Sequence, residues 1–222
     1  MITYSKTGTY HLSAGTGCQD ALLFRDTPEY RFLALADGAS GCENSRLGAE
    51  VACRAAADYY LTYGSTLKSC ADEKAAYLIL DQIRFCLEEA AAEQDVAPDS
   101  LSSTLTFCCI HKKRREMTVF HLGDGAVYAL NPGQAEALVH PAGSRGAPPL
   151  TMTINAHKRA QIHRFPLSPE SHVLICSDGL LKVLDSDNAQ GIRSCLSGRD
   201  YPALTRLLDE SQPFDDCSFI VC

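Results

Sequence analysis

Aspartates end several apolar, strand-like runs of this chain, at places where a buried strand would reach the surface. Asp37, Asp124 and Asp178 each follow such a run directly, and Asp215 stands just before the last one. A carboxylate is disfavoured within a strand and is costly to bury unless it is paired or bound to a cation. We therefore expect these side chains to converge on one charged site, filled by Mg2+ or Mn2+, which prefer oxygen ligands.

Three of these aspartates are followed by glycine, and Asp-Gly is also a strong signal for a tight turn. For Asp124 the turn interpretation is as strong as the functional one, because residues 126–130 resemble the returning strand of a hairpin. Asp37 is followed by small polar residues and then a helical pattern, so the functional interpretation leads there. Asp178 lies between these cases, because the segment behind it fits either a strand or the start of a helix.

The periodicity of the apolar residues predicts strands and helices that do not alternate one by one. This order disfavours a doubly wound parallel sheet and favours helices layered over mainly antiparallel sheets. Between residues 103 and 139 the strands read as a meander, and the Gly- and Pro-rich residues 141–149 are predicted to form a mobile loop. The predicted helices cover residues 43–64, 71–93, 186–196 and 200–210. The predicted strands cover residues 9–13, 20–25, 31–36, 103–110, 116–122, 126–130, 135–139, 150–155, 161–166, 172–177 and 217–222.

The composition limits the kinds of partner that this chain is expected to bind. A length of 222 residues allows one domain with a sizeable core, and we expect a single domain over residues 1–222. The formal net charge of -7 argues against nucleic acid, because neutralising phosphates dominates that binding. The only basic run, residues 112–115, reads as an exposed hairpin turn.

The cysteines and the lack of long apolar segments indicate the compartment. The chain has 11 cysteines, an odd number without a Cys-x-x-Cys pair, so we expect reduced core residues and no zinc site. No apolar segment approaches the roughly 20 residues that span a bilayer. The first residues do not resemble a signal peptide, so we expect a cytoplasmic protein without a membrane partner.

Six short motifs, built from Asp, Gly and small polar residues, separate the predicted strands and helices. They are Gln19-Asp20-Ala21, Ala36-Asp37-Gly38-Ala39-Ser40-Gly41, Ser102-Ser103-Thr104-Leu105, Leu122-Gly123-Asp124-Gly125-Ala126-Val127-Tyr128, Cys176-Ser177-Asp178-Gly179-Leu180 and Asp215-Asp216-Cys217-Ser218. In this order, and over nearly the whole chain, they resemble the metal-dependent Ser/Thr protein phosphatases of the protein phosphatase 2C family, as a short member of bacterial type.

The resemblance implies an α+β fold, a four-layer α-β-β-α sandwich of two mainly antiparallel sheets flanked by helices. It also implies two Mn2+ or Mg2+ ions in a cleft at one edge of the sheets. Asp37 would bridge both ions, and the backbone carbonyl of Gly38 would bind one of them. Asp178 and Asp215 would complete the other, which makes Asp37, Asp178 and Asp215 the implied catalytic residues.

Two further aspartates have implied roles at these ions. Asp20 would act through a metal-bound water, and Asp124 matches the position that holds a weaker third ion in many members. A water that bridges the two ions would hydrolyse phosphoserine or phosphothreonine. The implied substrate is a phosphorylated protein, with a cognate Ser/Thr kinase as a further partner. We assign no histidine as general acid, and we expect His121 and His163 to be core or sheet residues.

The chain departs from the family pattern at the residue that grips the substrate phosphate. Members usually carry an Arg at the position of Gly15, so another cation, such as Arg46 or Arg145, would have to reach the cleft. Members also carry an acidic residue at the position of Gln19. Three hypotheses remain: an active phosphoprotein phosphatase, a catalytically weak or inactive regulatory module of the same fold, and a hydrolase of small phosphate esters.

Overall fold

The computed structural model describes residues 1–140, 150–186 and 189–222, and its strands form two five-stranded sheets. Every neighbouring pair of strands is antiparallel. Sheet A consists, in spatial order, of β1 (Ile2–Lys6), β10 (Cys217–Val221), β9 (His172–Cys176), β6 (Ala126–Asn131) and β7 (Gln134–Val139). Sheet B consists of β2 (Ala21–Asp26), β3 (Tyr30–Ala36), β4 (Leu105–His111), β5 (Glu116–Leu122) and β8 (Gln161–Pro166).

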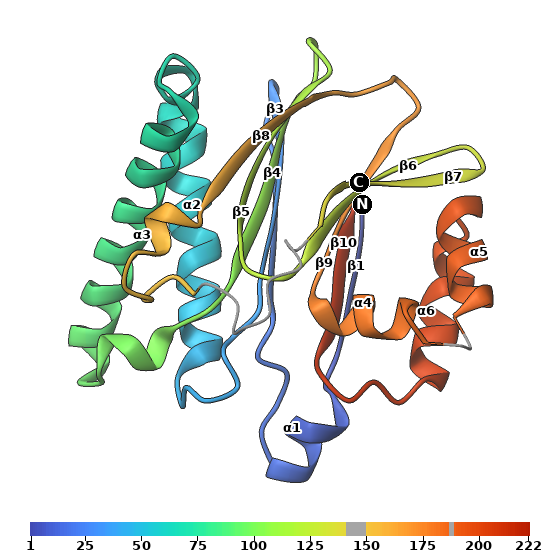
Figure 1. The fold of residues 1–222 in the computed structure, drawn as a ribbon, viewed down its shortest axis with the longest axis horizontal. Helices are drawn as coiled ribbons and strands as arrows, with labels where there is room; N and C mark the ends of the chain where they lie inside the picture. The colour runs from blue at the N-terminus through green and yellow to red at the C-terminus, as the bar shows by residue number, and fades with distance from the viewer. Residues whose placement is uncertain (141–149, 187–188) are drawn as a thin grey trace.

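Helices cover the outer face of each sheet, so the molecule has four layers (Figure 1). Two long helices lie on sheet B, and three shorter helices lie on sheet A, while α1 lies at one end of the sandwich (Figure 1). The predicted α-β-β-α sandwich is therefore confirmed. The helices are α1 (Thr9–Ala14), α2 (Ser45–Leu67), α3 (Asp72–Gln94), α4 (Asp178–Leu184), α5 (Gln190–Gly198) and α6 (Tyr201–Glu210), with short 3-10 turns η1 (Pro98–Leu101) and η2 (Ala156–Lys158).

Three layers of buried apolar side chains hold the sheets and helices together. In β3, Phe32 and Ala34 face α2 and α3, whereas Leu33 and Leu35 face sheet A. Successive side chains of a strand point to opposite faces, and both faces of this sheet are covered, so its strands read as continuous apolar runs. The third layer, between sheet A and the three shorter helices, is rich in leucine. None of the described helices is both long and apolar enough to cross a lipid bilayer.

The strand ends that carry the aspartates meet at the end of the sandwich where α1 lies (Figure 1). The start of β2 pairs with the end of β3 through Ala21 and Ala36, and the start of β10 pairs with the end of β9. The two chain termini lie side by side at the opposite end, because β1 and β10 pair with Ile2 beside Val221 (Figure 1). Antiparallel pairing thus gathers the motifs at one edge.

Two of the predicted elements were wrong, and one strand was missed. Residues 9–13 were predicted as a strand but lie in helix α1, and strand β1 was not predicted. Residues 150–155 were predicted as a strand but form turns that lead into η2. The ambiguous segment behind Asp178 is helix α4. The predicted mobile loop, residues 141–149, lies outside the described residues, and the other elements agree with the prediction to within a few residues.

The turn interpretation of Asp124 as part of a hairpin was also wrong. The strands before and after it, β5 and β6, belong to different sheets, so the chain crosses between sheets at this point. β6 is buried on both of its faces and pairs with β9 and β7 instead of β5. The predicted meander over residues 103–139 is therefore two separate hairpins, one in each sheet. The basic run, residues 112–115, does form the turn between β4 and β5.

Candidate active site

A cavity of about 310 Å³ opens where the strand ends meet, and we call it the Asp37 cavity. It brings together five of the six predicted site residues, because each lies at the end of a strand or just beyond one. The sixth, Asp20, precedes β2 and borders a neighbouring cavity. The Asp37 cavity is lined by Asp37, Gly38, Ala39, Ser40, Thr104, Asp124, Leu150, Asp178 and Asp215.

The backbone around Asp37 is fixed by the Ser102-Ser103-Thr104 motif. The Asp37 N–H donates to Thr104 Oγ1 over 3.0 Å, and the Thr104 N–H donates back to the Asp37 carbonyl over 2.8 Å. The next residue, Gly38, has no room for a side chain, because a Cβ there would lie 2.9 Å from the Gln19 carbonyl oxygen and from Ser45. Glycine is therefore required here by close packing, since this loop does not form a two-residue hairpin turn.

Close packing also requires the glycine after Asp178. A Cβ on Gly179 would lie 2.0 Å from the carbonyl oxygen of Asp216, so the first turn of α4 packs directly on the backbone before β10. This contact brings Asp178, the first residue of α4, to the same side of the cavity as Asp215. The Asp-Gly pairs at residues 37 and 178 thus mark close backbone approach beside the cavity.

Asp20 is a buried carboxylate without a hydrogen-bond partner. Its side chain is only 4% exposed, and neither of its oxygens is hydrogen-bonded within the described parts of the chain. The hydroxyls of Ser177 and Ser218 donate elsewhere, to a backbone carbonyl and to Ser5 Oγ. Burial, followed by repulsion from Asp216, raises the pKa of Asp20 to about 7. A cation nearby would remove this penalty.

The other carboxylates of the site repel one another in the same way. Burial, and then the charges of Asp20, Asp178 and Asp215, raise the pKa of Asp37 well above its usual range. Burial is also the main cause that raises the pKa of Asp124 to about 6 and the pKa of Asp178 above its ordinary value. Groups perturbed by burial and by like charges in one cavity are typical of a functional site.

Lys182, which the sequence analysis did not identify, lies against two of these carboxylates. Its Nζ donates to Asp178 Oδ2 at 2.6 Å and to Asp215 Oδ2 at 2.9 Å. Although burial works against its charge, these hydrogen bonds raise the pKa of Lys182 above its ordinary value. The i to i+4 spacing from Asp178 places it on the same face of α4, and this spacing is the only signal that the sequence offers.

The donors at the cavity fit a hard divalent cation. They are carboxylate oxygens and a backbone carbonyl, the ligands that Mg2+ and Mn2+ prefer. The two oxygens of Asp20 and the Oδ1 of Asp178 are buried without a hydrogen-bond partner in the described chain. No three Asp, Glu, His or Cys side chains of residues 1–140, 150–186 and 189–222 come close enough together to hold one ion. The carboxylates would therefore have to move toward a metal ion.

Two further residues that the sequence analysis did not identify, Asp216 and His11, support the segment that carries Asp215. Asp216 is 1% exposed and accepts hydrogen bonds from the N–H groups of Gly8 and Gln19, at 2.8 Å and 2.6 Å. His11 Nδ1 hydrogen-bonds at 2.8 Å to Oδ2 of Asp216, the oxygen that also accepts from Gln19. These bonds join α1 and the loop before β2 to the segment that carries Asp215. They span about 200 residues of chain, which no local pattern could reveal.

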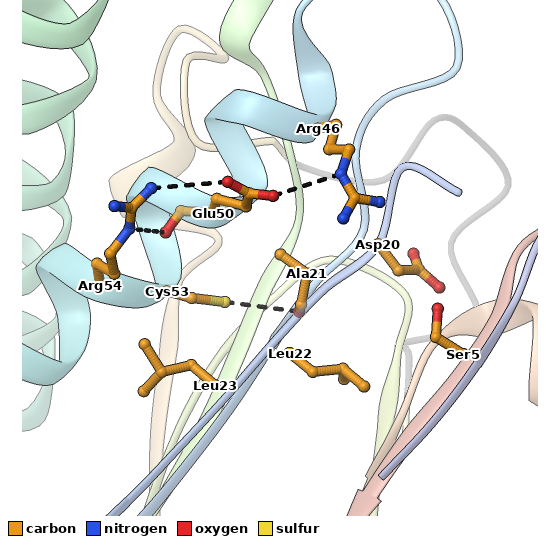
Figure 2. A pocket seen from close by; sticks show the side chains of 9 residues that line it. All are labelled: Ser5, Asp20, Ala21, Leu22, Leu23, Arg46, Glu50, Cys53 and Arg54. Carbon is orange, nitrogen blue, oxygen red and sulfur yellow. Dashed lines mark hydrogen bonds and ion pairs between the residues drawn. The ribbon is translucent and has the colours of Figure 1, made fainter. Parts of the chain in front are cut away.

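The position expected to hold a phosphate-gripping Arg is an exposed helix end. Gly15 caps the C-terminus of α1 with a φ of 70°, a left-handed conformation that strains any other side chain. Arg46 does not line the Asp37 cavity. It donates to the Cys18 carbonyl and pairs with Glu50, and Figure 2 shows the contact with Glu50. Together with Asp20 it lines the neighbouring cavity of about 460 Å³. Arg145 lies outside the described residues.

Comparison with known proteins identifies the family. Residues 7–209 match the family model of protein phosphatase 2C, so this chain belongs to the protein phosphatase 2C family. Membership of this family, together with the fold and the acidic cavity, supports a Ser/Thr phosphatase. No curated protein matches the chain.

Solved structures of bacterial phosphatases share the fold. A bacterial serine phosphatase superposes with a TM-score of 0.69 at 18% identity, covering 99% of this chain and 95% of the other. The serine/threonine phosphatase Stp1 from Staphylococcus aureus has a TM-score of 0.68 at 16% identity, with coverages of 99% and 92%. RsbX in complex with magnesium has a TM-score of 0.61 at 17% identity, again covering 99% and 92%. Identities this low establish the fold alone.

Proposed function

We propose that this protein is a metal-dependent phosphatase that hydrolyses phosphoserine or phosphothreonine in proteins. The observation that carries the proposal is the convergence of Asp37, Asp124, Asp178 and Asp215 on one cavity from four separate parts of the chain. A molecule with no use for a cation would gain stability by replacing such a cluster. Family membership and a neighbour solved with magnesium agree with this function.

The residues that would hold two divalent cations are assigned by the same proposal. Asp37 and the Gly38 carbonyl would bind one ion, and Asp37, Asp178 and Asp215 the other, while Asp20 would act through water and Asp124 at a third ion. Bound cations of this kind lower the pKa of a water and neutralise charge on phosphate oxygens.

The chain's own residues then have supporting roles. Thr104 fixes the backbone of Asp37 through two hydrogen bonds, and Asp216 holds the segment of Asp215 through its three partners. Phosphoprotein substrates, a cognate Ser/Thr kinase, a cytoplasmic location and a single domain over residues 1–222 stay predictions.

One observation favours a second candidate, a regulatory module of the same fold that has lost turnover. Gly15 stands at an exposed helix end where an Arg would bind the substrate phosphate, and Arg46 is bound elsewhere. The first candidate requires both the cation site and catalysis, whereas the second requires neither. Turnover and metal binding must therefore be measured separately.

We expect hydrolysis of p-nitrophenyl phosphate and of a phosphothreonine peptide with Mn2+, and none with EDTA. Asp178→Asn should lower kcat/KM by at least about 100-fold, since a lost group at the reacting centre costs several kcal/mol. Asp81→Asn, on the exposed face of α3, is the matched control and should keep full activity. Turnover that persists in EDTA would contradict the proposed mechanism.

The melting temperature tests the cation site that the first candidate requires. Mn2+ at about 100 times its dissociation constant should stabilise the protein by about 2.7 kcal/mol if it binds only the folded state. Stabilisation without turnover would favour the regulatory module. A melting temperature that does not respond to Mn2+ or Mg2+ would rule out the metal-dependent phosphatase.

A further inference from the structure

Lys182 joins two carboxylates that come from different parts of the fold. Asp178 begins α4, and Asp215 lies in the segment before β10. One ammonium group hydrogen-bonds to both, at 2.6 Å and 2.9 Å. The Lys182 side chain is 53% exposed, whereas those of Asp178 and Asp215 are 18% and 22% exposed. The ammonium therefore lies beside two lining residues of the Asp37 cavity, on a side chain that is about half exposed to solvent.

At Asp215, Lys182 holds an oxygen that a divalent cation would also need. The proposed function assigns Asp178 and Asp215 to one ion, and Lys182 Nζ contacts an Oδ2 of each. The other oxygen of Asp215 accepts from the Asp216 N–H at 2.9 Å, so an ion at Asp215 needs the oxygen that Lys182 occupies. A lysine ammonium is a compact, strongly hydrated charge with three donors, so it offsets the repulsion between two carboxylates as a metal would. Two cations cannot occupy the same place between these oxygens. Binding of a metal there requires Lys182 to leave.

We propose that Lys182 is an internal counter-ion which a divalent cation must displace from Asp178 and Asp215, so that this lysine sets the metal affinity of the site. The inference rests on the proposed function. Lys182 has a flexible four-carbon stem and is half exposed, so its ammonium can move into water without unfolding α4. Because the ammonium is tethered one helical turn from Asp178, it competes at a high effective concentration.

Two opposite effects follow from this role. Without a metal, Lys182 lowers the repulsion within the carboxylate cluster and stabilises the folded chain. With a metal, the same bonds must be broken first, so they weaken the apparent affinity. Removal of the ammonium should therefore destabilise the metal-free protein and tighten metal binding, a combination that loss of an ordinary metal-binding residue would not produce.

Calorimetric titration with Mn2+ tests this inference. Lys182→Met should bind Mn2+ about tenfold more tightly than the unmodified chain, or about 1.4 kcal/mol, and should melt at a lower temperature in EDTA. Lys182→Arg keeps a positive charge and should stay closer to the unmodified protein in both measurements. Lys113→Met removes the same charge from the exposed turn between β4 and β5, and should change neither.

Unchanged or weaker Mn2+ binding by Lys182→Met would overturn the inference, while leaving the proposed function intact. Absence of Mn2+ binding by the unmodified chain would remove both. A measurement on the unmodified chain guards against a variant that does not fold. Acetylation rates followed by mass spectrometry should rise for Lys182, but not for Lys113, when Mn2+ is added, and a rate for Lys182 that does not rise would also overturn the inference.

Discussion

The carboxylate of Asp20 lies in unfavourable surroundings. It is almost fully buried, its oxygens lack partners within the described chain, and Asp37 lies close enough for each charge to affect the other. Groups that serve a binding site often cost stability when the ligand is absent. Asp20 should therefore show a trade-off between stability and metal binding.

We predict that Asp20→Asn raises the stability of the metal-free protein. At pH 8 in EDTA the gain should be about 2 kcal/mol, because a neutral amide replaces a buried charge without a partner. The stabilisation by added Mn2+ should shrink in the same variant. Thermal unfolding with EDTA and with Mn2+ measures both effects, with Asp81→Asn as the exposed control. A metal-free melting temperature below that of the unmodified chain would show that the charge of Asp20 is already compensated.

Some site residues could be identified from the sequence and others could not, for a physical reason. Asp37 and Asp178 end apolar strands, so the local pattern marks them. Lys182 is one lysine on a short helix, and its importance depends on a contact with Asp215 that only the folded chain makes. His11 likewise contacts a residue far along the chain. Local patterns reveal strand ends, but they cannot reveal which distant side chains meet there.

At the scale of elements, close packing decides where α4 lies. Its first turn contacts the backbone before β10 with no space for a methyl group at Gly179. Gly198, the last residue of α5, has no atom within 4 Å of where a Cβ would lie. The two glycines are both helical and are on the same side of sheet A, so they form a matched pair.

We predict opposite effects for alanine at these two positions. Gly179→Ala should destabilise the protein by about 2 kcal/mol, since overpacking outweighs the better helix propensity of alanine, and it should weaken Mn2+ binding by shifting Asp178. Gly198→Ala should be neutral or stabilise by about 0.5 kcal/mol. Urea unfolding and Mn2+ titration provide the measurements. Equal free energies of unfolding for the two variants would mean that α4 can shift away from the backbone before β10 without loss of stability.

The elements that were predicted wrongly share one cause. In residues 9–13, polar and apolar side chains alternate as in a strand, and a helix of six residues is too short to show its own period. Residues 150–155 also alternate, but the Thr153 hydroxyl accepts from the Leu150 N–H at 3.1 Å and fixes a turn. Periodicity alone therefore does not assign short alternating segments.

At the scale of the whole molecule, a histidine lies buried between the two sheets. His121 is 5% exposed, shares the inner face of β5 with Met117 and Val119, and hydrogen-bonds to Thr106 Oγ1 at 2.9 Å. Burial, and then the charge of His163, lower the pKa of His121 to about 4. The unfolded chain, with an ordinary histidine pKa of about 6.5, binds a proton that the folded chain excludes.

This difference predicts a loss of stability in acid. The contribution of neutral His121 is complete above about pH 6.5 and is lost as the pH falls toward about 4, which amounts to about 2 kcal/mol near pH 4.5. His121→Asn should remove this part of the pH dependence. Urea unfolding of both proteins at neutral and acidic pH gives the comparison. Parallel pH profiles for the two proteins would show that folding does not lower the pKa of His121.

The place of β10 in sheet A has a consequence for the order of folding. β10 lies between β1 and β9, yet it is the last strand along the chain. Ser218 of β10 hydrogen-bonds to Ser5 of β1, and the two residues are 213 positions apart in the sequence. Sheet B is complete once β8 has been made, whereas sheet A stays in two parts until residues 217–221 are available. Closing so long a loop is slow and costs chain entropy. Asp215, which precedes that strand, reaches the cavity only in the same late step.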